Sequence, residues 1–177
     1  MDRPLADIKE ESALVRRARW GDQRAFEVLY DRHVAAIYSL AYRLTGNRSA
    51  AEDIVQDTFL RMVQFIGGLR GDRPLRPWLK RVAANAAIDR MRRERATSDL
   101  ADLDPADDAG LSAEALQEAD ALLRRLPSDI RTVIWLHIVE GWTHAELAAR
   151  FGRSESWSKS IVSRALQQLR TENGITA

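Results

Sequence analysis

Apolar residues recur every three or four positions along most of this chain, a pattern that predicts amphipathic helices. A weak pattern covers residues 5–19. The strongest covers Ala25–Leu44, with Asp22 placed to cap that helix at its start and Gly46 placed to end it. No segment alternates apolar and polar residues as a half-buried strand does, so we expect an all-α protein. His33 lies on the apolar stripe of Ala25–Leu44, and we interpret it as a packed residue rather than a catalytic one.

The next predicted helix begins at the capping box Ser49-Ala-Ala-Glu52 and ends at Gly67-Gly68. Its apolar residues form one stripe that we expect to be buried: Ala51, Val55, Thr58, Phe59, Met62 and Ile66. The opposite stripe consists of Asp53, Gln56, Asp57, Leu60 and Gln64. Acidic and amide groups around one leucine are typical of a partner surface. A solvated face that happens to carry a leucine has the same pattern, so both interpretations stay open.

A third strong helix is predicted over Pro77–Arg95, with Pro77 in the first turn, where the missing N–H of proline costs nothing. One stripe of this helix is expected to be buried: Trp78, Leu79, Val82, Ala83 and Ala86. A second face consists of Arg81, Asn85, Ile88 and Arg92. Guanidinium and amide groups in a row suit contacts with phosphates and bases. The alternative is a solvated arginine face in which Asp89 pairs with an arginine one turn later.

The acidic segment 96–111 shows no helical pattern, and we interpret it as a linker between an N-terminal domain, residues 1–95, and a C-terminal domain, residues 112–177. Four helices are predicted in the C-terminal domain: Ser112–Leu126, Asp129–Val139, Ala145–Arg150 and Glu155–Arg170. The last two, with Gly152 between them, have the lengths and the turn of a helix-turn-helix.

Capping residues mark both of these helices, because Thr143 and Glu146 form a capping box and Ser154 precedes the last helix. The inner stripe of the last helix is Ile161, Val162, Ala165 and Leu169. The outer stripe, which suits base edges and phosphates in the major groove, is Ser156, Lys159, Ser160, Ser163 and Gln167, with Arg153 in the turn. A helical bundle that binds no DNA is the alternative. Ser158 falls on the inner stripe, so either Trp157 fills that position or the helix begins later.

Charge along the chain is uneven, although the formal net charge is only +1. Residues 24–95 carry 14 basic and 8 acidic residues, residues 96–120 carry 8 acidic and no basic ones, and residues 121–177 carry 8 basic and 5 acidic ones. Two basic blocks therefore flank an acidic one, and basic blocks attract polyanions. Within the first block, the glycine-rich basic segment 67–76 is either a loop that wraps a nucleic-acid strand or a plain connector.

Composition excludes several classes of function. The chain has no cysteine, and its three histidines are scattered, so disulfides, thiol nucleophiles and thiolate or paired-histidine metal sites are not expected. No nucleophile–base grouping or phosphate loop is present, so we expect neither an enzyme nor a cofactor. No apolar run is long enough to span a bilayer, and residues 1–11 lack an apolar signal core. We expect a cytoplasmic protein without membrane insertion.

Four segments, over residues 22–95 and 112–170, resemble the bacterial sigma factors of the extracytoplasmic-function (ECF) type, in the sigma-70 family of RNA polymerase sigma factors. These segments are AFEVLYDRH, SAAEDIVQDTFLRM, PWLKRVAANAAIDRMRR and WTHAELAARFGRSESWSKS, and all four match in order and spacing. The resemblance implies that the N-terminal domain is sigma region two and the C-terminal domain is sigma region four. It implies a protein that directs core polymerase to specific promoters and helps to open their minus-ten DNA.

The resemblance also assigns roles to residues of this chain. Region two docks on the clamp helices of the largest polymerase subunit, and four residues match that docking motif: Asp53, Gln56, Asp57 and Phe59. Phe59 lies on the predicted buried stripe, so the candidates are the other three together with Leu60, the leucine at the centre of their exposed stripe. The candidates for minus-ten binding and melting are Arg76, Trp78, Arg81, Asn85 and Arg92. Region four reads the minus-thirty-five element with the outer stripe of the last helix and contacts the polymerase flap. The acidic linker is expected to thread toward the active-site channel, and an anti-sigma factor is an expected partner.

The last helix departs from the family pattern, because recognition helices of this family commonly read GTVKSR, whereas this chain reads SWSKSI. Lys159 and Ser160 are kept, while Ser158 replaces the usual valine and Ile161 the usual arginine. Two other functions stay open on the sequence alone. A conventional repressor or activator uses only the helix-turn-helix, and a decoy docks on polymerase without opening DNA.

Overall fold

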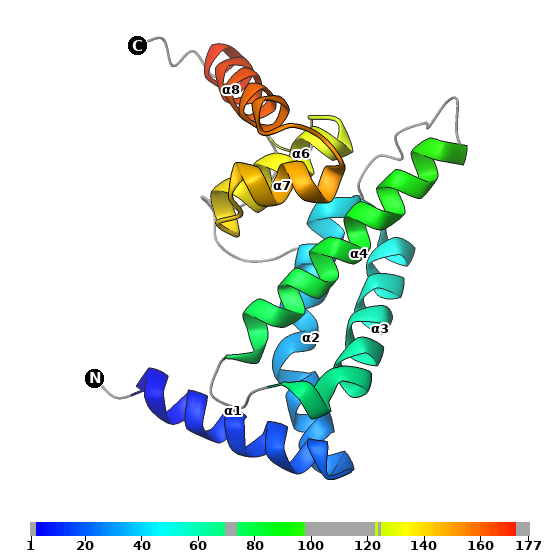
Figure 1. The fold of residues 1–177 in the computed structure, drawn as a ribbon, viewed down its shortest axis with the longest axis vertical. Coiled ribbons are helices and arrows are strands. Elements are labelled where there is room, and N and C mark those ends of the chain that lie inside the picture. Colours follow the sequence, from blue (N-terminus) through cyan, green and yellow to red (C-terminus); the bar gives the residue numbers. More distant parts are fainter. Residues whose placement is uncertain (1–2, 70–73, 98–122, 124, 173–177) are drawn as a thin grey trace. The chain divides into compact units, whose positions relative to one another are not determined.

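The computed structural model describes residues 3–69, 74–97, 123 and 125–172, and describes only the backbone of residues 3–7, 95–97 and 172. All of its regular elements are helical and no strand occurs among these residues, which confirms the all-α fold class (Figure 1). The elements are α1 (Arg3–Arg19), α2 (Gln23–Thr45), α3 (Arg48–Phe65), the short 3-10 helix η1 (Ile66–Gly68), α4 (Leu75–Thr97), α6 (Ser128–Ile134), the π-helical turn η2 (Trp135–Val139), α7 (His144–Phe151) and α8 (Glu155–Glu172).

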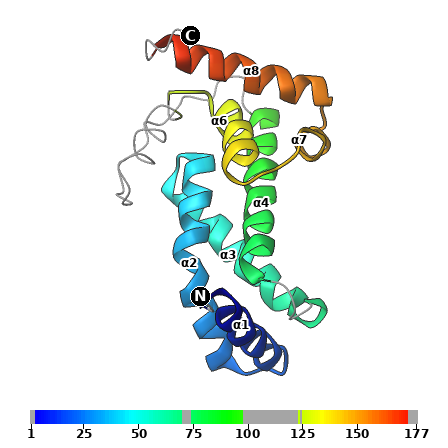
Figure 2. The same cartoon turned by 90° about the vertical axis from the view of Figure 1, so that its left-hand side faces the viewer.

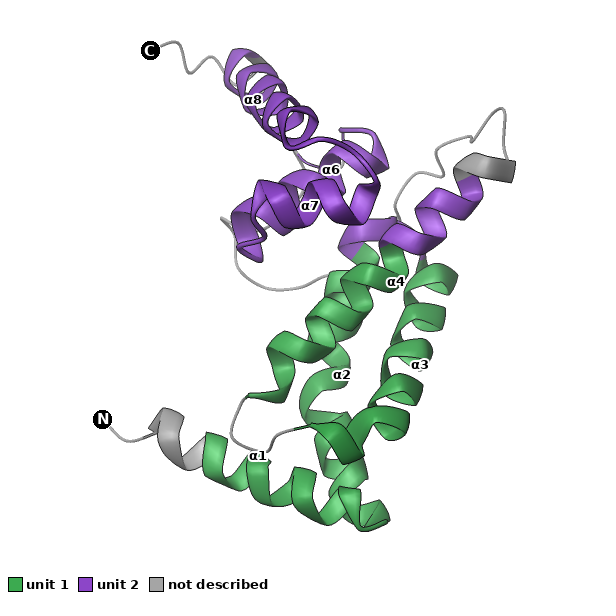
Figure 3. Cartoon of the chain, in the orientation of Figure 1, with its two compact units in different colours: residues 1–42, 48–87 green, residues 43–47, 88–177 purple. Residues whose placement is uncertain are grey.

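Two compact units make up the chain, as Figure 3 shows. Unit 1 contains residues 1–42 and 48–87, and unit 2 contains residues 43–47 and 88–177. The division therefore passes through α2 and α4 and through the connection between α2 and α3. Residues 98–122, which include most of the predicted linker and of the predicted helix Ser112–Leu126, lie outside the described residues. The predicted domain boundaries stay a prediction.

Unit 1 is built around apolar stripes on α2, α3 and α4, which lie side by side in Figures 1 and 2. Its largest fully buried side chains include Leu29 and Ile37 of α2, Met62 of α3 and Leu79 of α4. Burying one such side chain contributes roughly 1.5–3 kcal/mol, so these contacts are the main source of stability. All six residues of the predicted α3 stripe are buried.

Two helix boundaries follow the sequence prediction and one does not. Asp22 caps α2, because its Oδ1 accepts a hydrogen bond of 3.1 Å from the N–H of Ala25. That hydrogen bond and the guanidinium of Arg17 lower the pKa of the Asp22 carboxyl. Gly46, with φ +70°, follows the end of α2 as expected. The predicted capping box at Ser49 is wrong, because α3 already begins at Arg48 and a residue inside the first turn cannot be its N-cap.

The exposed face predicted for α4 needs a correction at Ile88. The side chain of Ile88 has an exposed fraction of 0%. Ala84, Ala87 and Met91 are buried as well, so this part of α4 is buried over more of its circumference than the single predicted stripe. The carboxylate of Asp89 does not pair with an arginine one turn later on α4, as the alternative interpretation expected. It pairs with Arg150 of α7, within unit 2.

The helix-turn-helix in unit 2 forms as predicted. Thr143 and Glu146 complete a reciprocal capping box at the start of α7, and Gly152, with φ +64°, ends that helix in a left-handed conformation. Ser154 caps α8, because its hydroxyl accepts a hydrogen bond of 3.2 Å from the N–H of Trp157. The predicted helix Asp129–Val139 divides into α6 and the π-helical turn η2. The α7 and α8 helices pack against each other, and α6 packs on α8.

Candidate nucleic-acid interface

The outer face of α3 is exposed along its whole length. Every residue of the predicted partner stripe is exposed, and Leu60 at its centre has an exposed fraction of 59%. A further apolar residue, Val63, borders this stripe and is 53% exposed, although it was not among the predicted residues. Two exposed apolar side chains within one turn of each other, surrounded by acidic and amide groups, favour a partner surface.

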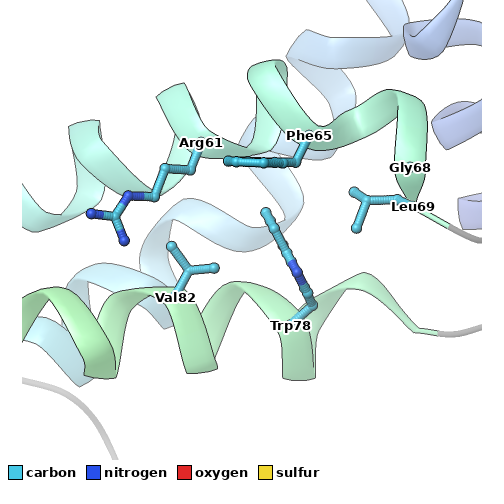
Figure 4. A pocket seen from close by; sticks show the side chains of 6 residues that line it. All are labelled: Arg61, Phe65, Gly68, Leu69, Trp78 and Val82. Carbon is cyan, nitrogen blue, oxygen red and sulfur yellow. The ribbon is translucent and has the colours of Figure 1, made fainter.

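A pocket of about 410 Å³ lies in unit 1 where α3 ends and α4 begins. Its lining residues are Arg61, Phe65, Gly68, Leu69, Trp78 and Val82. Figure 4 shows the indole of Trp78 reaching from α4 toward the ring of Phe65 on α3, with Leu69 on one side and Val82 and Arg61 on the other. Two aromatic rings and one guanidinium can stack on a flat, electron-rich ring such as a nucleobase.

Only Trp78 among the predicted minus-ten residues lines this pocket. Arg76 and Arg81 are exposed on the first turns of α4, Asn85 is half-buried one turn beyond Arg81, and Arg92 is exposed in the part of α4 that belongs to unit 2. The structure therefore adds Arg61 and Phe65, from α3, to the candidates on α4. In the sequence, Phe65 is an aromatic residue at the edge of the buried α3 stripe, and that position by itself does not indicate a pocket.

A carboxylate from α1 connects the helices next to the pocket. Glu11 Oε2 lies 3.1 Å from His33 Nε2 on α2, and Glu11 Oε1 accepts a hydrogen bond of 2.6 Å from the N–H of Leu75, the first residue of α4. His33 is buried, as predicted, and burial lowers its pKa despite the nearby Glu11 charge, with smaller lowering effects from Arg76 and Arg32. The imidazole is therefore neutral at pH 7, and with its proton on Nε2 it donates to Glu11.

The outer face of α8 is exposed as predicted. Each of Arg153, Ser156, Lys159, Ser160, Ser163 and Gln167 is open to solvent. An acidic residue, Glu155, borders this face and lies 3.7 Å from Lys159, one turn along the helix. An exposed pair of this kind is weak, so Lys159 stays available to a phosphate.

Ser158 occupies the inner stripe itself, so neither of the two expected explanations holds. The α8 helix begins at Glu155 as drawn from the sequence, and Trp157 packs on Phe151, with 5.3 Å between the ring centroids, rather than filling the position. Ser158 has an exposed fraction of 0%, and its hydroxyl lies 3.0 Å from Nδ1 of His144. The buried hydroxyl thus has a hydrogen-bond partner, which removes most of the cost of burying it.

The ring of His144 lies against that of His137, with the two planes tilted by 31°. The rings of His137 and His144 are 4.2 Å apart, and Nδ1 of His137 lies 2.7 Å from the carbonyl oxygen of Trp142. Desolvation and the neighbouring charges of His137 and Lys159 lower the pKa of His144. Ile161 is buried, so its departure from the family arginine changes the packing of α8 rather than its exposed face.

Within the described part of the chain, no cluster of three or more histidine, cysteine, aspartate or glutamate residues could hold a metal ion. Among the same residues, no helix is both long and apolar enough to cross a membrane.

Comparison with known families assigns both parts of the chain. The model of sigma-70 region 2 matches residues 29–97, and the model of sigma-70 region 4 matches residues 116–169. The chain belongs to the sigma-70 family. It is 34% identical to the ECF RNA polymerase sigma factor SigL of Mycobacterium tuberculosis (strain ATCC 25618 / H37Rv), over 93% of this chain and 99% of that protein. It is 33% identical to the RNA polymerase sigma factor CarQ of Myxococcus xanthus, over 87% of this chain and 92% of that protein.

Two solved structures share the fold. CnrH, in complex with the cytosolic domain of CnrY, matches with a TM-score of 0.54 and 27% identity over 94% of this chain and 99% of that chain. The sigma factor RpoE of Bartonella quintana, in complex with the anti-sigma factor NepR, matches with a TM-score of 0.58 and 26% identity over 86% of this chain and 98% of that chain. This protein is thus an ECF sigma factor that directs RNA polymerase to promoters.

Replacing Ser158 by alanine tests the hydrogen bond that supports the recognition helix. Because Ser158→Ala leaves Nδ1 of His144 without its partner, we expect the free energy of unfolding to fall by about 1 kcal/mol. Urea denaturation followed by circular dichroism measures the change. Ser160→Ala is the matched control, since it makes the same change in helix propensity on the exposed face of α8. Equal effects of the two substitutions would contradict the role given to the Ser158 hydroxyl.

Proposed function

We propose that this sigma factor opens promoter DNA by holding one unpaired base of the minus-ten element in the pocket between α3 and α4. The supporting observation is that two aromatic side chains, Trp78 and Phe65, line the same pocket, with the indole of Trp78 reaching toward the ring of Phe65. Base–aromatic stacking contributes roughly 1–3 kcal/mol per base, which is comparable with the cost of unstacking one base.

The basic residues of α4 complete this interface. Arg76 and Arg81 are exposed near the pocket end of the helix and suit the phosphates of the opened strand. Asn85 and Arg92 lie farther along α4 and are further candidates for contacts with that strand. Binding energy alone then favours the open strand, so the protein acts without catalysing a reaction. The minus-thirty-five element is read by the outer face of α8, whose hydroxyl, amide and ammonium groups match the groups exposed in the major groove.

The outer face of α3 serves as the docking surface for the polymerase core. Leu60 forms an apolar centre, and the polar residues Asp53, Gln56 and Asp57 surround it, which is the anatomy of a protein interface. By the family resemblance, the partner is the pair of clamp helices of the largest polymerase subunit, and unit 2 contacts the flap.

An anti-sigma factor is a further proposed partner. The sigma factor RpoE of Bartonella quintana, which shares the fold of this chain, is described in complex with the anti-sigma factor NepR. A protein that works on DNA and polymerase acts in the cytoplasm, which we propose as its location.

Removing two polar groups from the α3 face tests the docking surface. Because both residues are exposed, the double variant Asp53→Ala with Gln56→Ala should fold normally and bind core polymerase about tenfold more weakly, a loss of about 1.4 kcal/mol that is ordinary for interface residues. Fluorescence anisotropy of labelled protein titrated with core polymerase measures the affinity. The matched control is Gln23→Ala with Glu27→Ala, an exposed amide–acid pair on α2. The control should bind core polymerase like the wild type. If the α3 double variant also does so, the docking assignment fails.

Replacing the tryptophan of the pocket tests the base site. Trp78→Ala should weaken binding of the holoenzyme to a non-template oligonucleotide with the minus-ten sequence by about tenfold, because one stacking surface is lost. Binding to duplex DNA that carries only the minus-thirty-five element should not change. Trp20→Ala is the matched control, since Trp20 is 88% exposed and does not line the pocket. If Trp78→Ala binds the oligonucleotide as tightly as the wild type does, the base site is refuted.

A further inference from the structure

The carboxylate of Glu11 connects three helices of unit 1. It comes from α1, pairs with His33 of α2 and accepts the first N–H of α4, from Leu75. The side chain of Glu11 is only 15% exposed, and that of His33 only 6%. Two hydrogen bonds to one shielded carboxylate fix its position well, and they join segments that are 22 and 64 residues away in the sequence.

The bond to Leu75 lies at the end of α4 that carries the pocket. The first N–H groups of a helix have no partner inside the helix, and they form its positive end, so a carboxylate there satisfies a donor and interacts favourably with the helix dipole. Trp78, the pocket tryptophan, lies three residues after Leu75, at the end of the same first turn. Any movement of the first turn of α4 therefore moves the indole.

The opposite wall of the pocket also depends on α1. This helix contacts η1, which ends α3 and contributes Gly68 to the pocket. Figures 1 and 2 both show α1 at the end of unit 1 where α3 ends and α4 begins. One helix thus supports both segments between which the pocket opens, while none of its described side chains, from Ile8 onward, lines the pocket.

His33 keeps the carboxylate available to α4. Its lowered pKa keeps the imidazole neutral at pH 7, so it orients Glu11 by a hydrogen bond without cancelling the negative charge. Arg76, on the first turn of α4, is close enough to affect His33, which places a proposed DNA-contacting residue in the same electrostatic neighbourhood.

From these contacts we infer that Glu11 is a positioning residue for minus-ten recognition, because it holds the first turn of α4 and thereby sets where Trp78 stands in the pocket. The inference rests on the proposed function of the pocket. It assigns to α1, a helix outside the DNA-contacting surface, control over how well an unpaired base is bound.

Changing the charge of Glu11 without changing its size is the direct test. In the holoenzyme, Glu11→Gln should bind a fluorescent non-template oligonucleotide, taken from a promoter found by transcript mapping, about tenfold more weakly, which is the effect expected for losing a charged hydrogen-bond partner. Affinity for core polymerase should stay at the wild-type value. Glu10→Gln is the matched control, because Glu10 is a neighbouring carboxylate on α1 that is exposed and pairs with Arg32 instead of α4. The control should bind the oligonucleotide like the wild type.

A double-mutant cycle with Trp78→Ala separates positioning from general stability. If Glu11 acts through the indole, Glu11→Gln should have little further effect on oligonucleotide binding once Trp78 is alanine; independent losses would overturn the inference. Wild-type binding by Glu11→Gln, together with weak binding by Trp78→Ala, refutes positioning and leaves the base site intact. Wild-type binding by Trp78→Ala refutes the base site itself. If Glu11→Gln does not fold, Glu11→Asp, which keeps the charge and shortens its reach, takes its place with the same expected outcomes.

Discussion

Close packing of α4 is the constraint on which unit 1 and its pocket depend. Four alanines, at positions 83, 84, 86 and 87, are buried along the middle of this helix. Small side chains allow neighbouring helices to approach closely, since the distance between packed helices depends on the residues at the contact. The large Trp78 stands before this close-packed stretch, near the start of α4, where it is half-buried rather than enclosed. The same packing turns Arg81 to the solvent. A basic face and an open aromatic pocket therefore follow from how α4 is buried.

Much of this arrangement is encoded locally and could be predicted. The period of apolar residues identified α2, α3 and α4, and the exposed α3 stripe from Asp53 to Gln64 followed from the buried one, because the two faces of a helix are complementary. The capping box at Thr143 and Glu146 has a sequence signature of its own, so α7 was placed within a residue of its observed start. The outer face of α8 was predicted for the same reason as that of α3.

Features that depend on long-range contacts could not be predicted. Ile88 was assigned to an exposed face, because periodicity does not show that a helix is buried over a wide arc. The role of Ser158 required its partner His144, 14 residues away, and a serine on an apolar stripe does not reveal that partner. The pocket combines Phe65 with Trp78, and Glu11 binds a backbone N–H 64 residues later in the chain. Such pairings belong to the packed structure, and no local pattern records them.

Transcript mapping with purified components is the direct test of whether this protein directs RNA polymerase to promoters. Bacterial core polymerase, this protein and a library of genomic fragments would be combined, and the 5′ ends of the transcripts sequenced. A promoter-directing sigma factor should give discrete starts, each preceded by the same two spaced upstream elements, and core polymerase alone should not. A lack of discrete starts would refute promoter direction by this protein. DNA bound by the protein alone would then indicate a conventional regulator, and core polymerase bound without DNA would indicate a decoy.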